Sequence, residues 1–195
     1  MKNKIKIISE LSDFEKVYKV FSEEPYNEKY TEEELQNMFN EYSKKGYIYG
    51  LYKEKECVGM CVIVKGVEEK QPVKFKNEKV MYLAELAVLK KFRRKGLGKS
   101  LILYGIMQSK LLNYEKMYMR TLEKGSMSYG IAKRIGFEEM ENTYQYVERA
   151  RTNGKIEKLK NIFLEFDFKK LNKDFLKKEI KSITNKEKGD EYERI

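Results

Sequence analysis

The stretch from residue 80 to residue 112 constrains the fold of this chain most. Val80–Leu89, VMYLAELAVL, is an almost continuous apolar run, which is typical of an inner strand covered on both faces. In the next ten residues, Lys90–Lys99 (KKFRRKGLGK), six are basic and two are glycine. Leu97–Leu112 then has helical length and a broad apolar surface. The sequence therefore predicts a buried strand, a basic glycine loop and a helix as the central unit.

Shorter strands and helices are predicted on both sides of this unit. Before it, we expect a strand at 4–8, helices at 14–21 and 31–45, and a hairpin of strands at 47–52 and 58–64. After it, we expect a strand at 116–121, a helix at 126–135, and antiparallel strands at 144–147 and 162–168. Thr31 and Ser126 stand at helix starts, and Gly46 and Gly136 at helix ends.

These elements predict an α/β (α+β) fold with a mixed, mostly antiparallel central sheet of about six or seven strands and helices on both faces. The length suits one domain, which we place at residues 1–170. Residues 171–195 are predicted to form an amphipathic C-terminal helix and a frayed tail, because apolar residues recur there at helical spacing. That helix would pack on the domain or bind a partner protein.

The basic composition does not by itself identify a partner. Lys and Arg exceed Asp and Glu by 41 to 31, a net charge of +10, which can attract nucleic acid or another anion. The lysines are spread along the whole chain, however, which is typical of a compositional bias. Because there is no histidine, catalysis through an imidazole and metal binding by one are excluded.

Cys57 and Cys61 lie four residues apart in a predicted strand. Two cysteines without histidine cannot complete a tetrahedral zinc site, so we expect two buried thiols on one face of the strand and no metal. No apolar run approaches the roughly 18 residues of a membrane-spanning helix, and the first residues do not resemble a signal peptide. We therefore expect a cytoplasmic protein without a membrane partner.

A strand that leads through a basic glycine loop into a helix is suited to bind phosphate. Backbone N–H groups and the positive end of the helix dipole point outward there, and glycine allows close approach. Gly98-Lys-Ser100 resembles the end of a nucleotide-binding P-loop, but Arg93 stands where its first glycine is needed. The dinucleotide fingerprint fails as well, because Leu101 replaces its third glycine.

Arg93-Arg-Lys-Gly-Leu-Gly98 does match the form Arg/Gln-x-x-Gly-x-Gly/Ala, directly after Leu86-Ala-Val88 and a short spacer. This resembles the acetyl-CoA-binding motif of the GNAT superfamily of N-acetyltransferases. Ile135-Gly136-Phe137 also resembles the Gly-Phe that closes the family's next helix. The order of elements is similar from about residue 4 to residue 169, and the C-terminal helix lies outside the resemblance.

The resemblance implies a binding site for acetyl-CoA, with coenzyme A as the product. The backbone of Leu86, Ala87 and Val88 would bond the pantetheine arm, much as a neighbouring strand would. Amides of the loop would hold the pyrophosphate, and basic side chains would add charge. The residues implied in the loop are Arg93, Arg94, Lys95, Gly96, Leu97, Gly98 and Lys99, with the charge coming from Arg93, Lys95 and Lys99.

Acetyl transfer to an amine needs a base, and without histidine a carboxylate or a tyrosine must serve. Glu85 precedes Leu86 and is the first candidate, because a partly desolvated carboxylate has a raised pKa; the alternative is a carboxylate that only positions the substrate or forms a salt bridge. Tyr82 is the second candidate. Members of the family commonly have a tyrosine that acts as the acid, and Ala132 stands at its position here. Tyr129, one helical turn earlier, is therefore the candidate acid.

Three functions remain open at this point. The first is an acetyl-CoA-dependent N-acetyltransferase whose acceptor is a primary amine of a small molecule, peptide or protein. The second is a catalytically silent acyl-CoA-binding regulatory module, and the third is a nucleic-acid-binding protein, which we do not expect. The acceptor pocket would lie around residues 23–30 and 144–146, where aromatic and acidic side chains gather. A homodimer remains open.

Overall fold

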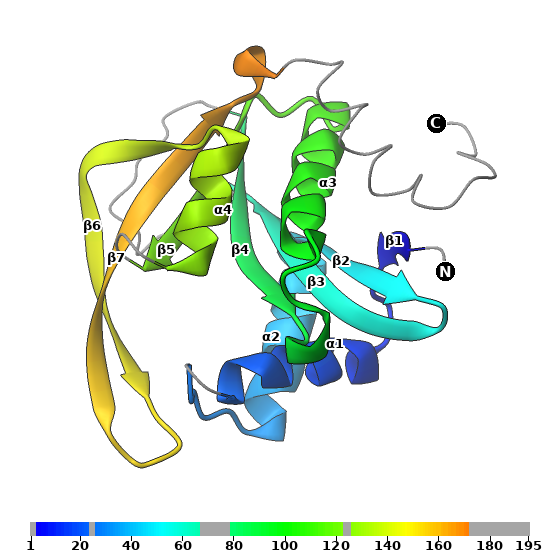
Figure 1. Cartoon of the computed structure of the whole chain (residues 1–195), viewed down its shortest axis with the longest axis vertical. Helices are drawn as coiled ribbons and strands as arrows, with labels where there is room; N and C mark the ends of the chain where they lie inside the picture. Colours follow the sequence, from blue (N-terminus) through cyan, green and yellow to red (C-terminus); the bar gives the residue numbers. More distant parts are fainter. Residues whose placement is uncertain (1–2, 24–25, 67–78, 123–125, 172–195) are drawn as a thin grey trace.

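The computed structural model describes residues 3–23, 26–66, 79–122 and 126–171. The strands are β1 (Asn3–Ile7), β2 (Gly46–Lys53), β3 (Glu56–Lys65), β4 (Val80–Val88), β5 (Lys116–Leu122), β6 (Glu138–Ala150) and β7 (Ile156–Asp167). The α-helices are α1 (Leu11–Tyr18), α2 (Glu32–Lys45), α3 (Leu97–Leu111) and α4 (Met127–Ile135). The strands form one sheet in the order β1-β2-β3-β4-β5-β7-β6 (Figure 1).

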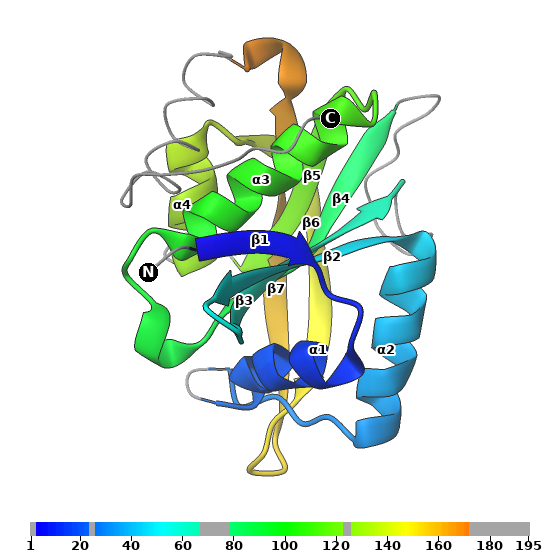
Figure 2. The same ribbon diagram turned by 90° about the vertical axis from the view of Figure 1, so that its right-hand side faces the viewer.

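Helices cover both faces of this sheet, as the sequence predicts. Helices α3 and α4 lie on one face, and α1 and α2 lie on the other (Figure 2). Each face has its own core, because the inner strands carry apolar side chains on both sides. The sheet is mixed, since β4 and β5 are parallel while the other neighbouring strands are antiparallel.

The two central strands separate halfway along their length. The parallel pairing of β4 with β5 runs from Val80↔Lys116 to Leu83↔Met119 and no further. Beyond it, β4 stays paired with β3, and β5 stays paired with β7, so the strands diverge (Figure 1). From residue 84 onward, the edge of β4 that faces β5 is therefore unpaired by any strand in the described part of the chain.

A β-bulge lies in β4 where this divergence begins. Val62 pairs with Glu85 and Ile63 pairs with Leu83, so Ala84 is an extra residue in β4. A bulge rotates the residues after it to the opposite face. Strict alternation would place Glu85 with Leu83 on the α3 face, but the bulge places it on the α1–α2 face.

A second bulge corrects the expectation for the two cysteines. Leu51 pairs with Gly59 and Tyr52 pairs with Cys57, so Val58 is an extra residue in β3. Both thiols are free and buried, as expected. Cys57 lies in the α1–α2 core and Cys61 in the α3–α4 core, so the prediction that they share a face is wrong.

The predicted helix signals are present. Thr31 and Glu34 form a reciprocal capping box at the start of α2, and Ser126 caps α4. Gly136 ends α4 with a φ of 111°. Gly46 follows the last residue of α2 but is not left-handed, since its φ is −170°. Glycine is needed there because a Cβ would lie 2.0 Å from the backbone oxygen of Ile63.

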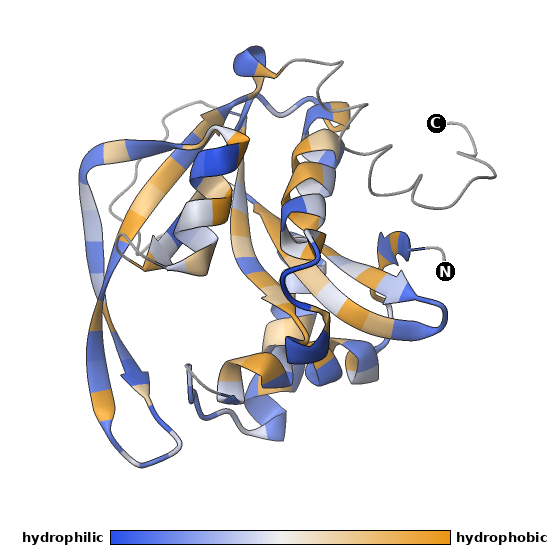
Figure 3. Ribbon diagram, in the orientation of Figure 1, coloured by the Kyte–Doolittle hydropathy of each residue, from blue (hydrophilic) through white to orange (hydrophobic). Residues whose placement is uncertain are grey.

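The last hairpin is longer than the sequence predicts. Strands β6 and β7 include many charged residues at their distal ends (Figure 3), so hydropathy alone does not reveal them there. The turn contains Asn153-Gly154, as expected, with Gly154 at a φ of 79°. The predicted C-terminal amphipathic helix lies outside the described residues, and the boundary at residues 170 and 171 stays a prediction.

Candidate active site where β4 and β5 diverge

The loop after β4 forms an open helix N-terminus. Arg94 and Gly96 have φ values of 62° and 80°, which turn successive backbone N–H groups to one side. Gly96 is the N-cap of α3, makes no side-chain cap, and no acidic residue lies in the first turn. The N–H groups at the start of α3 and the positive end of its dipole can therefore meet an anion.

The residues around this loop fit a phosphate group. A Cβ on Gly96 would meet nothing within 4 Å, so the space above the loop is open. The Nε of Arg93 donates a 2.9 Å hydrogen bond to the carbonyl of Val88, while its Nη2 is buried without a partner among the described residues. A phosphate oxygen can satisfy such a donor. Arg93 thus fixes the end of β4 and keeps one N–H group without a partner among the described residues.

The free edge of β4 leads up to this loop. The N–H of Leu89 bonds to the carbonyl of Val58 in β3 at 2.9 Å. Because antiparallel pairing alternates, the backbone groups of Leu86 and Val88 point away from β3, and those of Ala87 point toward it. A Cβ on Gly59 would lie 3.0 Å from the Ala87 oxygen, in agreement. Of the three expected backbone contacts, Leu86 and Val88 lie on the free edge.

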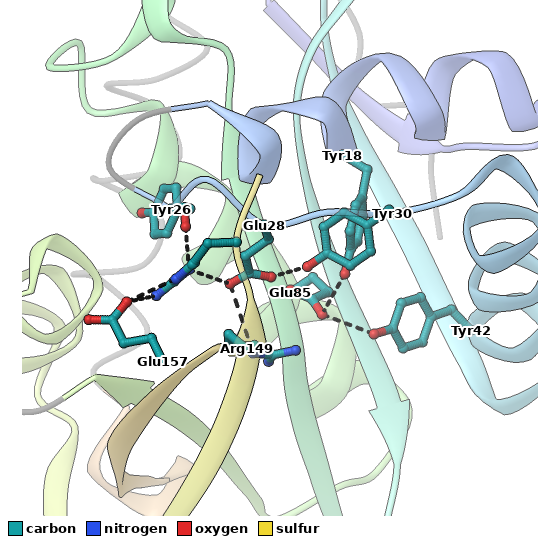
Figure 4. Close-up of polar contacts among 9 residues, drawn as sticks. Tyr18, Tyr26, Glu28, Tyr30, Tyr42, Glu85, Arg149 and Glu157 are labelled. Carbon is teal, nitrogen blue, oxygen red and sulfur yellow. Dashed lines mark hydrogen bonds and ion pairs between the residues drawn. The ribbon is translucent and has the colours of Figure 1, made fainter. Parts of the chain in front are cut away.

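Glu85 lies on the other face of the same strand end, among tyrosines. Its Oε1 accepts hydrogen bonds from Tyr18 of α1 at 3.2 Å and from Tyr42 of α2 at 3.0 Å (Figure 4). Burial raises the pKa of Glu85, while the Tyr42 hydrogen bond and the charges of Arg149 and Arg120 oppose that rise. Glu85 is therefore a carboxyl whose pKa lies above its ordinary value of 4.5, as the sequence predicts.

Sequence reasoning missed the tyrosines that hold Glu85. Tyr18 and Tyr42 occupy positions in the apolar stripes of their helices and are indistinguishable there from core residues. The available signal is chemical, because a buried tyrosine hydroxyl needs a hydrogen-bond partner where phenylalanine does not. Two tyrosines on the inward faces of two helices thus indicate a polar group between them.

A charged contact, here called the strap, joins the tip of the β6–β7 hairpin to the segment between α1 and α2. Its backbone part is a bridge between Glu28 and Arg151, with Thr152 N–H donating to the Asn27 carbonyl at 2.7 Å. Arg151 also donates to the Tyr26 carbonyl and pairs with Glu157 at 2.6 Å (Figure 4). The strap lies beside the cluster that surrounds Glu85 (Figure 4).

Glu28 connects the strap to the tyrosine cluster. It accepts a hydrogen bond from the hydroxyl of Tyr30, whose ring meets that of Tyr18 edge-on with centroids 5.1 Å apart. It also lies 3.8 Å from Arg149 and 3.9 Å from Arg151. The carboxylates and arginines on this face are thus linked from the hairpin tip to Glu85.

The other expected site residues have different surroundings. Tyr82 is only 2% exposed, and its ring stacks on Tyr118 with centroids 4.6 Å apart, so it forms part of the core. The Tyr129 hydroxyl donates to Glu139 of β6 at 2.5 Å, a contact that raises the pKa of Tyr129. Ala132, which replaces the family's tyrosine, is fully buried.

The exposed tyrosines of the hairpin do not line the Glu85 site. Tyr144 pairs with Ile162, which packs on the α3–α4 core, so Tyr144 and Tyr146 face away from Glu85. Lys160 and Lys158 lie over their rings at 5.5 and 5.0 Å. Gln145 lies between the two tyrosines and faces the side of Glu85 instead.

The described residues were also compared with the requirements of a membrane-spanning helix and of a metal site. None of the helices in the described part of the chain has both the length and the apolarity needed to span a bilayer. The described residues also contain no group of three or more Cys, Asp or Glu side chains arranged to hold a metal ion.

Comparison with known proteins identifies the family. A sequence model of the acetyltransferase (GNAT) family matches residues 11–137, more than half of the chain. No curated protein matches the sequence significantly. The structure is similar to an acetyltransferase of Bacillus subtilis in complex with CoA, at 20% identity and a TM-score of 0.60, covering 85% of this chain and 99% of that one.

Two further solved structures have the same fold. The ribosomal-protein-S18-alanine N-acetyltransferase of Escherichia coli is 12% identical with a TM-score of 0.62, covering 88% of this chain and 97% of that one. Ard1 of Thermoplasma volcanium is 16% identical with a TM-score of 0.61, covering 86% and 98%. The likeness in structure shows the fold, and the match of the sequence model over residues 11–137 shows that this chain belongs to the acetyltransferase (GNAT) family.

Proposed function

We propose that this protein is an acetyl-CoA-dependent N-acetyltransferase that acetylates a primary amine of a small molecule, peptide or protein. The observation that carries the proposal is the arrangement around residues 84–88. A phosphate-binding loop and a free strand edge lie beside one face there, and a carboxyl with a raised pKa lies on the other. A donor and an acceptor can therefore meet through the gap between β4 and β5.

The coenzyme would be held by the groups that the sequence singles out. The backbone groups of Leu86 and the N–H of Val88 offer hydrogen bonds along the free edge, while the Val88 carbonyl already accepts one from Arg93. The N–H groups at the start of α3 would face the pyrophosphate. Arg93 offers its spare Nη2, and Lys95 and Lys99 contribute charge. When bound, acetyl-CoA supplies an acetyl thioester whose transfer to an amine forms an amide and releases coenzyme A as the thiol.

Glu85 is the proposed base, directly or through a water. Among the described residues, both hydrogen bonds to this carboxylate go to Oε1, which leaves Oε2 to accept the proton that the amine loses. A pKa raised toward the working pH suits that role. Tyr82 is the weaker candidate, because a ring stacked in the core and 2% exposed cannot meet an acceptor.

The departing thiolate of coenzyme A also takes up a proton. Tyr129 is the candidate donor to the departing thiolate, but its proton is engaged by Glu139, and its pKa is raised. Thiolate is a good leaving group, so protonation by water suffices if Tyr129 does not serve. We therefore expect a small role for Tyr129, and Tyr129→Phe tests it.

The test is a thermal-shift titration with acetyl-CoA and coenzyme A, followed by thiol release against a panel of amines. A ligand that binds only the folded state stabilises it by about 2.7 kcal/mol at a hundred times its dissociation constant. A saturable shift with thiol release that depends on the amine supports the proposal. Absence of any shift would overturn the coenzyme assignment.

A catalytically silent acyl-CoA-binding regulatory module is the second candidate. The observation that favours it is Ala132, a fully buried alanine where many relatives carry the acidic tyrosine. It predicts saturable coenzyme binding without turnover of any amine, a result that the same experiment distinguishes. That the protein is cytoplasmic and that it forms a homodimer both stay predictions from the sequence.

A further inference from the structure

Arg120 of β5 lies on the same face as Glu85, across the gap between the strands. Tyr118 belongs to the α1–α2 core and Met119 to the α3–α4 core, so alternation places Arg120 on the α1–α2 face. It follows Met119, whose pairing with Leu83 is the last between the two strands. Arg120 and Glu85 thus flank the gap just past the stacked pair of Tyr82 and Tyr118.

Arg120 is half-buried and has a neutral partner. Its Nη1 donates a 3.0 Å hydrogen bond to Oε1 of Gln145 in β6, and among the described residues it forms no ion pair. The neighbouring arginines differ in this respect. Arg149 lies 3.8 Å from Glu28, and Arg151 lies 2.6 Å from Glu157. Of these three arginines, Arg120 therefore has no acidic side chain in contact with it among the described residues.

The balance of charge at the gap then limits which amines can bind. An amine arrives largely as an ammonium, which brings one positive charge. Glu85 offsets one positive charge, and Arg120 adds another, so a simple alkylamine would leave one uncompensated positive charge in a partly desolvated site. Such a charge is costly unless an anion pairs with it. Transfer of the amine's proton to Glu85 leaves this net charge unchanged, because the amine and the carboxylate neutralise each other and the charge of Arg120 remains.

We propose that the acceptor carries a carboxylate or a phosphate close to its amine, and that Arg120 together with Gln145 binds this anionic group while Glu85 faces the amine. The inference rests on the proposed function and names its substrate class. A guanidinium fixed by an amide on one side presents its remaining N–H groups as a planar fork, which matches the two oxygens of such a group. Free amino acids and amino-phosphates both fit, whereas plain alkylamines do not.

The experiment compares acceptors that differ only in the anionic group. Leucine is paired with isoamylamine, tyrosine with tyramine, lysine with cadaverine, and phosphoethanolamine with ethanolamine. The first three pairs test a carboxylate and the fourth tests a phosphate. Each is assayed by thiol release with wild-type protein, Arg120→Gln and the control Arg134→Gln, which removes the same charge from an exposed position on α4.

We expect the anionic member of at least one pair to be turned over at least tenfold more efficiently by the wild type. Arg120→Gln should raise KM for that acceptor by about 10- to 100-fold, the usual loss for a hydrogen bond to a charged group, with a smaller change in kcat. The KM of its neutral partner should stay the same or fall, and the Tm shift with acetyl-CoA should not change. Arg134→Gln should behave as wild type.

The results distinguish a wrong assignment of Arg120 from a wrong proposed function. If acetyl-CoA binds but no anionic acceptor is preferred, or if Arg120→Gln affects both members of each pair equally, the assignment of Arg120 is wrong and acetyl transfer stands. If acetyl-CoA produces no Tm shift in the wild type, the proposed function is wrong, and this inference falls with it.

Discussion

Tyr42 donates a 3.0 Å hydrogen bond to Glu85, a residue 43 positions later in the chain. The bond joins the inner face of α2 to the bulged end of β4. A hydrogen bond to a carboxylate favours its ionised form, whereas burial favours the neutral form. Tyr42 thus limits a rise in pKa that desolvation of Glu85 causes, so the two effects together set the pH at which the proposed base becomes active.

Replacing Glu85 by glutamine should slow acetyl transfer by about 100-fold or more, the usual contribution of a positioned base. Affinity for acetyl-CoA should stay the same, because the groups proposed to bind the coenzyme do not include the carboxyl of Glu85, which lies on the α1–α2 face. Steady-state kinetics and a coenzyme titration measure the two effects. A variant as active as the wild type between pH 6 and 9 would show that Glu85 is not the base.

Replacing Tyr42 by phenylalanine should shift the rising limb of kcat/KM against pH to higher pH. The hydrogen bond that favours ionised Glu85 is lost, so the pKa of the base rises. The control is Tyr144→Phe, which removes an exposed hydroxyl from the other face of the sheet. A limb shifted to lower pH, or equal profiles for both variants, would contradict this account.

Glu85→Gln should also make the protein more stable, and more so at high pH. The pKa of Glu85 is raised in the folded state above 4.5, so below that pH both states hold the proton and no penalty arises. As pH rises through the folded pKa, only the folded state must bury the charge, and stability falls. Each 1 kcal/mol of relief should raise Tm by about 2–4 °C. Scans at pH 4.5 and pH 8 should show the larger gain at pH 8.

Gly96→Glu should abolish coenzyme binding, because its carboxylate would occupy the space above the loop and repel phosphate. Any side chain at a φ of 80° is strained, at a cost of about 1–2 kcal/mol, so a matched control is needed. Gly154→Glu supplies it, since Gly154 has a φ of 79° and equally open space in the hairpin turn. Coenzyme titrations should show binding lost in the first variant and retained in the second.

Arg151→Gln should loosen the strap and raise KM for the acceptor several-fold, with KM for acetyl-CoA unchanged. The Arg151 side chain is only 11% exposed and contacts Glu28, Glu157 and the Tyr26 carbonyl, so its loss should cost about 1–3 kcal/mol of stability. Lys155→Gln removes an exposed charge from the same turn and should change neither quantity. An equal rise in both KM values would indicate a global rather than a local effect.

Much of the fold could be predicted because local patterns specify it. The apolar run of β4, the glycine loop, the cap at Thr31 and the turn at Asn153-Gly154 each depend on a few neighbouring residues. The distal part of the β6–β7 hairpin could not be predicted, because its charged residues are held by pairing with each other and by the strap rather than by burial.

The sequence by itself determined the order of elements, the basic glycine loop before α3 and the identity of Glu85 as the acidic residue beside it. Only the tertiary structure decided which face Glu85 occupies, since that depends on one extra residue, Ala84, in the pairing with β3. It also brought Tyr18, Tyr42 and Arg120 to the same gap from three separate elements. The physical reason is that a motif is local, whereas register and desolvation arise from contacts between segments far apart in the chain.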